Sequence, residues 1–442
     1  MMMNISFRFK ALVSGSLVLM LAGCFSHSTE QVSKVSKTPN LPSASTSVFP
    51  STSVAMGSVH YGKDGTTYRR VAFSALPQWQ QQNFSGSLNA FKNSCLSLRK
   101  QTQWQSVCQI AQSINDNHQA KNFFEQYFSA WEVAQNGKLA GMVTGYYEPV
   151  LQGDDHQTAR ARFPIYGIPD DFVSLKLPEQ YRQYSGSIAF NVTGKNTASV
   201  VNNGAYSATL SQFQRNSGSV KGRLVGTRLV PYYTRDQING GALNNRAPIL
   251  AYANDPVELF FMHIQGSGRI QTPDGRYIRL GFADKNNYPY VSIGKYMADK
   301  GYLPLAQTSM QNIKAYLAQN PHRLAEVLGQ NPSYIFFQPL TGSADQGPIG
   351  ALNVPLTGEF SGAVDKRYIT LGAPIFLATT HPDTRKALNK LIIAQDTGSA
   401  IKGAVRVDYF WGYGDAAGKI AGKQKDTGYV WQLLPNGILP QS

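Results

Sequence analysis

Hydrophobic residues recur at helical spacing between residues 79 and 131. Steps of three and four residues place side chains on one face of a helix. Three sets of residues follow this spacing: Phe84, Leu88, Phe91, Cys95 and Leu98; Trp104, Val107, Cys108, Ala111 and Ile114; and Phe123, Phe124, Tyr127, Phe128 and Trp131. The spacing predicts three helices whose aromatic side chains pack in a core rather than contact a ligand.

The pattern changes after Gly137 to short apolar runs separated by turn residues, which is typical of strands. We expect strands at residues 139–147, 163–167, 223–233, 249–252, 259–265, 334–338, 369–380, 391–395 and 405–410. We expect turns at 202–204 and 273–275, and short helices at 292–300, 309–319 and 323–328. The chain is therefore predicted to be mainly β, with an α-helical N-terminal segment.

The N-terminus has the features of an export signal. Arg8 and Lys10 precede an apolar stretch, residues 11–21, that is too short to span a bilayer. The stretch ends in Leu21-Ala22-Gly23-Cys24, which resembles the lipobox of bacterial lipoproteins. That resemblance implies a signal peptide at residues 1–23 and an acylated Cys24 at the mature N-terminus.

The segment after the lipidated cysteine has two informative features. Phe25, and not Asp, comes directly after Cys24, which by resemblance to lipoprotein sorting favours an anchor in the outer membrane, facing the periplasm. Residues 25–58 are rich in Ser, Thr, Pro and Val, a composition that cannot bury a core. We therefore expect a flexible tether over residues 24–60 and no later segment that spans a membrane.

The charge of the chain is strongly positive but diffuse. Lys and Arg number 41 against 26 acidic residues, giving +15 over 442 residues, or +13 once Arg8 and Lys10 are removed with the signal. No basic run is longer than two residues, which argues against nucleic acid as a partner. The net positive charge instead favours a diffuse attraction to an anionic surface such as cell-wall polymer or lipid headgroups.

Cys95 and Cys108 are the two cysteines left after the lipobox. An even pair in an oxidising compartment predicts a disulfide, which here would join the first two predicted helices. Two cysteines and seven scattered histidines give no pattern of metal ligands. We therefore expect neither a metal nor an organic cofactor.

The candidate chemistry lies in the C-terminal third, because the chain contains no G-x-S-x-G, C-x-x-C, H-E-x-x-H or P-loop motif. Asp365, Asp396 and Asp408 lie against short strands and glycine-rich turns. Alternation places Arg406, Asp408 and Phe410 on one face of the strand predicted at 405–410. An Asp in a strand is unfavourable unless it is solvated, paired or functional.

The arrangement of the three aspartates resembles the three-Asp double-psi β-barrel domain of peptidoglycan-cleaving proteins. Upstream segments resemble the motif blocks of the membrane-bound lytic murein transglycosylase A family: residues 144–150 (TGYYEPV), 231–235 (PYYTR), 263–268 (HIQGSG), 292–295 (SIGK) and 330–334 (QNPSY). Together the blocks run from about residue 139 to 434, roughly two thirds of the chain.

The resemblance implies a double-psi barrel interrupted by an inserted β-domain, with a glycan groove between the two. Mapped onto this chain, the barrel would use residues 61–146 and 290–442, with the three-Asp region at 340–434. The inserted domain would span 147–289. Residues 170–222 are more than the motif spacing requires and predict an extra lobe.

The resemblance also implies non-hydrolytic cleavage of the β-1,4 bond between N-acetylmuramic acid and N-acetylglucosamine, leaving a 1,6-anhydro end. One carboxyl can act first as acid and then as base when the nucleophile is the C6 hydroxyl of the muramic sugar. Asp408 is the candidate for that role and Asp396 is the like charge that would raise the pKa of Asp408, while Arg406 would lower it. Asp365 is expected to be structural.

The same resemblance identifies candidate substrate contacts and partners. The candidate contacts are Tyr146, Tyr147, Glu148, Gln265, Gly266, Ser267 and Tyr409. The implied partners are peptidoglycan glycan strands, the outer membrane through the lipid anchor, and other wall-synthesis or wall-hydrolase proteins. Two alternatives remain open: a non-catalytic, expansin-like wall-binding protein, and a hydrolase that uses Asp396 or Glu148 as a second carboxylate.

Overall fold

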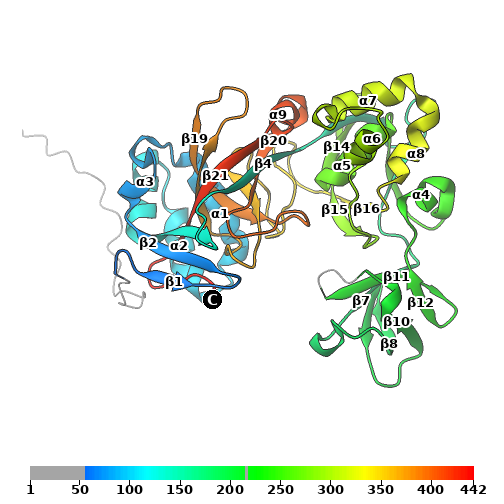
Figure 1. Cartoon of the computed structure of the whole chain (residues 1–442), viewed down its shortest axis with the longest axis horizontal. Coiled ribbons are helices and arrows are strands. Elements are labelled where there is room, and N and C mark those ends of the chain that lie inside the picture. Colours follow the sequence, from blue (N-terminus) through cyan, green and yellow to red (C-terminus); the bar gives the residue numbers. More distant parts are fainter. Residues whose placement is uncertain (1–54, 215–217) are drawn as a thin grey trace, which may run out of the picture. The chain divides into compact units, whose positions relative to one another are not determined.

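A computed structural model describes residues 55–214 and 218–442 (Figure 1). The predicted signal peptide, the predicted lipidation site Cys24 and most of the predicted tether lie outside the described residues. Among the described residues, no helix is both long enough and apolar enough to cross a membrane.

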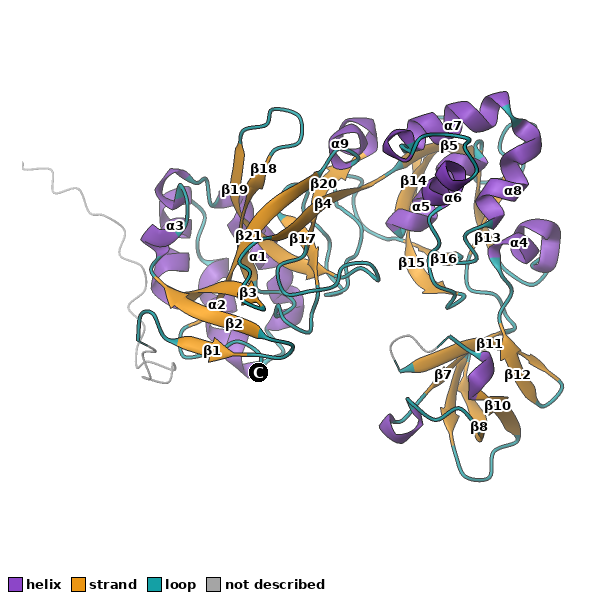
Figure 2. Ribbon diagram, viewed as in Figure 1, coloured by secondary structure: helices purple, strands orange, loops and turns teal. Residues whose placement is uncertain are grey.

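The first domain is built on a nine-stranded sheet in the order β1-β2-β3-β21-β18-β19-β17-β20-β4 (Figure 2). Its strands are β1 (Val59–Tyr61), β2 (Thr66–Val71), β3 (Phe128–Gln135), β4 (Gly141–Glu148), β17 (Ser361–Val364), β18 (Pro374–Thr380), β19 (Ala387–Asp396), β20 (Val407–Tyr413) and β21 (Lys425–Pro435). Strand β21 also pairs with β4, so that β21, β18, β19, β17, β20 and β4 form a closed ring. This is the barrel expected from the sequence.

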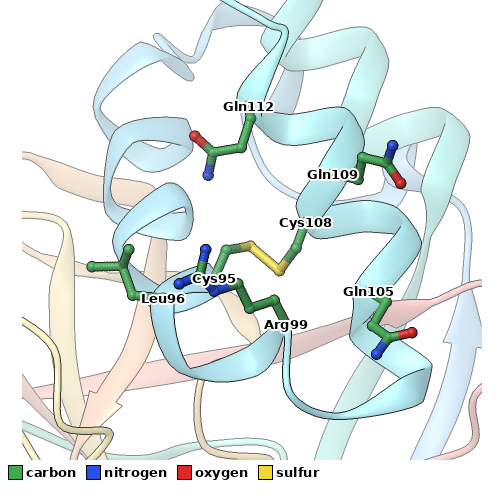
Figure 3. Close-up of a pocket in the computed structure, with 7 residues that line it drawn as sticks. All are labelled: Cys95, Leu96, Arg99, Gln105, Cys108, Gln109 and Gln112. Carbon is green, nitrogen blue, oxygen red and sulfur yellow. A yellow bond between two sulfur atoms is a disulfide. The ribbon is translucent and has the colours of Figure 1, made fainter.

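Helices α1 (Ser85–Leu98), α2 (Thr102–Gln112) and α3 (Asn117–Tyr127) pack on the barrel through one hydrophobic core. Cys95 on α1 and Cys108 on α2 form a disulfide, which confirms the predicted pair (Figure 3). Polar and half-exposed side chains surround the bond, with Gln105, Gln109 and Gln112 on α2.

The third predicted helix ends earlier than expected. The side chain of Asp116 caps α3 by accepting a hydrogen bond from the Gln119 N–H, but the helix stops at Tyr127. Phe128 and Trp131 belong instead to β3, which pairs with β2 and β21 on its two sides. A strand buried on both faces is apolar at nearly every position, so its aromatics can mimic helical spacing.

The second domain has a six-stranded sheet in the order β16-β15-β14-β5-β13-β6, covered by helices. Its strands are β5 (Val150–Asp154), β6 (Phe163–Tyr166), β13 (Ile249–Ala253), β14 (Ser267–Gln271), β15 (Tyr277–Lys285) and β16 (Ile335–Pro339). Its helices are α4 (Arg235–Gln237), α5 (Pro256–Gln265), α6 (Ile293–Asp299), α7 (Met310–Gln319) and α8 (Leu324–Gly329).

Two expectations for this domain differ from the structure. Residues 259–265, predicted as a strand, belong to helix α5, because Asp255 caps its N-terminus, Pro256 occupies the first turn and Gly266 ends it with a φ of 80°. Residues 290–339 do not return to the barrel as expected. Helices α5 to α8 share a core, and β16 pairs with β15, so this segment packs with the inserted domain.

A third unit interrupts the inserted domain between β6 and β13. It is a closed barrel in the order β10-β12-β11-β7-β9-β8 with its own hydrophobic core. Its strands are β7 (Phe172–Lys176), β8 (Ser187–Gly194), β9 (Thr197–Val200), β10 (Tyr206–Thr209), β11 (Ser219–Val225) and β12 (Arg228–Pro231). The single strand predicted at 223–233 is therefore two strands, joined at Gly226, whose φ of 58° allows a tight turn.

The C-terminal part of the chain forms helix α9 (Gly414–Ala421) and strand β21. The sequence pattern predicted neither element. Strand β18 begins at Pro374 rather than at residue 369, and β19 and β20 extend beyond their predicted ranges. The aspartates of interest lie on or directly after the last strands of the barrel.

Candidate active site

Strand β17 brings Asp396 and Asp408 together. It pairs in parallel with β19 and antiparallel with β20, and its Ala363 is the register partner of both Asp396 and Asp408. Two carboxyls that are 12 positions apart in sequence thus flank one residue of the strand between them. Asp408 lies within β20 and Asp396 is the last residue of β19.

Strand β4 supplies a hydroxyl to each carboxyl. It runs parallel to β20, with Thr144 opposite Asp408 and Tyr146 opposite Phe410. The Thr144 hydroxyl donates to Oδ1 of Asp408 at 2.5 Å, and the Tyr146 hydroxyl donates to Oδ2 of Asp396 at 3.1 Å. Two residues apart on a strand, these side chains share one face.

Asp396 is bound on both of its oxygens. Its Oδ1 accepts the Ala351 N–H at 2.9 Å, its Oδ2 accepts the Tyr146 hydroxyl, and the Thr397 N–H adds a third donor. Burial raises the pKa of Asp396 above its ordinary value, and these three donors oppose the rise because they favour the charged form.

Asp408 is buried but less tightly held. Burial raises the pKa of Asp408; the Thr144 hydrogen bond and the charge of Arg406 oppose the rise, and the nearby Asp396 carboxylate adds to it. Arg406 reaches Asp408 through Thr144, since its Nη2 donates to the Thr144 hydroxyl at 2.8 Å. As expected from the sequence, Asp396 raises the pKa of Asp408 and Arg406 lowers it.

Asp365, which directly follows β17, is 4% exposed and paired with Arg367 at 2.7 Å. Burial alone would raise the pKa of Asp365, but hydrogen bonds from Arg367 and from the Gly403 N–H hold it below its ordinary value. Because Gly403 lies in the loop between β19 and β20, Asp365 fixes the loop that joins the other two aspartates.

Tyr147 and Gln265 meet where β4 leaves the barrel. The Tyr147 N–H donates to Oε1 of Gln265 at 3.2 Å. Gln265 ends α5, Gly266 turns the chain with positive φ, and Ser267 opens β14 with 7% of its surface exposed. These four candidate contacts stay predictions.

Glu148 and Tyr409 lie away from the carboxyl pair. Glu148 is fully buried, and its carboxylate accepts a hydrogen bond from Nε of Arg269 at 2.8 Å. Tyr409 is also fully buried, and its hydroxyl donates to the Glu359 carbonyl at 2.6 Å. Alternation along β20 puts Tyr409 on the face opposite Asp408, so neither side chain presents a surface beside the aspartates.

Sequence reasoning missed Thr144 and the Ala351 N–H as partners of the aspartates. Thr144 could have been predicted, because it lies two positions before Tyr146 in the same motif block. Ala351 acts through its backbone N–H, so its side chain gives no signal in the sequence. Among the described residues, one group could hold a metal ion: Asp154, at the end of β5 in the inserted domain, with Asp155 and His156, which are exposed.

Comparisons with known proteins agree with this architecture. A family model described as the MltA specific insert domain matches residues 142–338, and one described as the 3D domain matches residues 360–434. The crystal structure of MltA from Neisseria gonorrhoeae is 59% identical to this chain, with a TM-score of 0.81, and the match covers 91% of this chain and 99% of that one.

Two further relatives are more distant. Membrane-bound lytic murein transglycosylase A of Escherichia coli (strain K12) is 36% identical over 207 residues, which is 45% of this chain and 55% of that protein. The chain thus matches just over half the length of that relative. The structure of E. coli MltA with bound chitohexaose is 25% identical, with a TM-score of 0.56, over 86% of this chain and 95% of that one.

Proposed function

This chain belongs to the MltA family, and from that premise we propose that it is a lytic transglycosylase. It cleaves the β-1,4 bond between N-acetylmuramic acid and N-acetylglucosamine in peptidoglycan and leaves a 1,6-anhydromuramic end. The relatives named as lytic murein transglycosylases and the structure with bound chitohexaose support a glycan substrate.

One observation favours Asp408 over Asp396 as the acid. Asp396 accepts hydrogen bonds on both oxygens, whereas Asp408 accepts one on Oδ1, and no described residue donates to its Oδ2. A carboxyl with a free oxygen and a raised pKa can hold a proton and deliver it to a substrate.

The reaction needs only this carboxyl and the sugar. Asp408 donates its proton to the glycosidic oxygen as the bond from that oxygen to C1 breaks. The C6 hydroxyl of the same muramic residue then attacks C1, and its proton passes to the Asp408 carboxylate, which restores the acid. Asp396 favours the protonated state of Asp408 before the step, and Tyr146 holds Asp396 in place.

The test is mass spectrometry of soluble products released from purified sacculi by the protein lacking residues 1–24. We expect anhydro ends, lighter by one water than hydrolytic products, and none from the Asp408→Asn variant. Reducing ends would instead indicate a hydrolase. Binding to sacculi without any release would indicate a wall-binding protein.

We also propose that acylation of Cys24 anchors the protein in the outer membrane, facing the periplasm, where other wall-synthesis or wall-hydrolase proteins could join it. The lipobox-like segment at residues 21–24 and relatives named membrane-bound support this. Fatty-acid labelling of the full chain, with Cys24→Ala as control, tests it. An unlabelled full chain, or labelling of Cys24→Ala, would contradict the anchor.

A further inference from the structure

One buried arginine contacts three segments that lead to the candidate active site. Arg269 on β14 is 1% exposed and donates through Nε to Oε2 of Glu148, at the point where β4 leaves the barrel. Its Nη1 donates to the Ala344 carbonyl, and its Nη2 donates to the Gln346 carbonyl at 2.8 Å. Both carbonyls lie on the segment that returns from the inserted domain to the barrel.

The third contact of Arg269 is with β20. The ring of Tyr413, the last residue of that strand, lies 3.9 Å from the Arg269 guanidinium. A planar guanidinium can donate from separate nitrogens to a carboxylate and to carbonyls while its face stacks on a ring, a geometry that the compact ammonium of lysine does not reproduce. Arg279 reinforces the return segment by donating to the carbonyls of Ser343, Gln346 and Gly347.

Each segment that Arg269 fixes leads directly to a contact with an active-site carboxyl. Glu148 is two residues past Tyr146, which donates to Asp396. Gln346 is five residues before Ala351, whose N–H donates to the same carboxyl. Tyr413 is five residues past Asp408. The Arg269–Glu148 pair therefore contacts all three segments at points outside the candidate active site.

We propose that the buried Arg269–Glu148 pair is a positioning unit for the transglycosylase reaction. The pair holds Tyr146 and Ala351, the hydrogen-bond donors of Asp396, so that Asp396 keeps its place beside Asp408. This inference rests on the proposed function. It gives Glu148 a role away from the substrate.

The expected signature is a change in pH dependence. The groups that act on the two carboxyls are Tyr146, Arg406 and the carboxyls themselves, together with the Thr144 hydroxyl and the N–H groups of Ala351 and Thr397. Loosening the Tyr146 and Ala351 donors raises the pKa of Asp396. A neutral Asp396 no longer raises the pKa of Asp408, so Asp408 loses its proton at a lower pH.

The first experiment compares Arg269→Lys with Arg235→Lys. Arg235 is a matched control because it is similarly buried in the inserted domain, but the residues that it contacts are not on the three segments that Arg269 contacts: Asn331, Ser333 and His263 by hydrogen bonds, and the rings of Phe260 and Tyr334. For Arg269→Lys we expect kcat on sacculi to fall by about 10- to 100-fold with KM nearly unchanged. The alkaline limb of its kcat/KM profile moves to lower pH, while that of Arg235→Lys stays in place.

A second measurement keeps the inference separate from the proposed function. Carbon-13 NMR of the aspartate carboxyls follows the two titrations without any turnover, in the wild-type protein and in the milder Glu148→Gln variant. A wild-type protein that cuts no glycan would contradict the proposed function only. Unchanged titrations of Asp396 and Asp408 in Glu148→Gln, or an Arg269→Lys profile that matches Arg235→Lys, would overturn the positioning role.

Discussion

Two carboxyls that flank the same strand residue differ in the hydrogen bonds that they accept. Asp396 is bound on both oxygens, while Asp408 keeps one oxygen unbound by the described residues. The sequence predicts both aspartates as candidates, because each lies in a glycine-rich block at a strand. It does not predict their different surroundings, which depend on β4, a strand 264 positions away along the chain.

Replacing Asp408 by Asn raises the thermal stability near neutral pH. Burial raises the pKa of Asp408, so the stability that its neutral form contributes is present at low pH and is lost as the pH rises through the raised value. The amide stays uncharged, and we expect Tm at about pH 7 to rise by roughly 1–3 °C. Scanning calorimetry between about pH 3 and 8 checks this, since the gain must vanish below the ordinary Asp pKa of ~3.9. A gain that is independent of pH would contradict it.

Thr144→Val removes the one hydroxyl that separates Arg406 from Asp408. The shape of the side chain is kept, but the hydrogen bond that favours the charged Asp408 is lost, so the pKa of Asp408 rises further. We expect kcat/KM to fall about 10-fold and its alkaline limb to move to higher pH. Thr144→Ser keeps the hydroxyl and serves as the control. A limb that moves to lower pH would mean that Arg406 pairs directly with Asp408.

At the scale of single elements, local signals decide which predictions succeed. Helices α6 and α7 match their predicted ranges within a residue or two, because Ser292 and Ser309 cap them and polar residues bound them. Helix α5 was missed although Asp255, Pro256 and Gly266 mark its ends. Its interior is apolar on nearly every side, so the run of residues alone could not separate a buried helix from a buried strand.

Helix α1 supports the strand that ends in Asp396. The side chain of Gln395, the residue before Asp396, donates to the Ala90 carbonyl at 2.9 Å and to the Ser94 hydroxyl at 3.0 Å. The disulfide to α2 leaves from Cys95, the residue after Ser94. The helical segment therefore stabilises the barrel beneath the candidate site without contributing a group to it.

Replacing both Cys95 and Cys108 by Ser lowers stability but leaves the products unchanged. A cross-link over 13 positions contributes about 3 kcal/mol by restricting the unfolded chain. We expect a lower urea midpoint and the same ratio of anhydro ends at about 25 °C, because the Gln395 hydrogen bonds remain. Reductant should destabilise the wild-type protein and not the variant. Equal midpoints for the two proteins without reductant would show that the disulfide does not stabilise the fold.

At the scale of the whole molecule, the mainly β class and the interrupted barrel could be inferred from the order of the motif blocks. The position at which the chain re-enters the barrel could not be inferred, because residues 290–339 carry helices that pack on α5 and a strand that pairs with β15. Those contacts join segments that are well separated in sequence. No local pattern encodes such pairing.

The net charge of +15, or +13 without the predicted signal peptide, predicts salt-dependent retention on sacculi. Charge that is spread over a surface acts at long range and is screened within about 10 Å at 0.1 M salt. We expect binding of the Asp408→Asn variant to sacculi to weaken several-fold between about 0.05 and 0.5 M salt. Binding to a neutral chito-oligosaccharide should not change. Retention on sacculi that does not change with salt would contradict this prediction, because the affinity would then come from specific contacts alone.

The closure of the barrel has a consequence for the order in which the protein assembles. Strand β4 finds its partners β20 and β21 only at the far end of the chain, whereas the inserted domain is continuous in sequence and has its own sheet. Non-local strand pairing is the slow part of folding. The inserted domain can therefore mature while the barrel is still open. Asp408 gains its Thr144 partner only once β20 has paired with β4, so the candidate site is completed after the inserted domain has its own sheet.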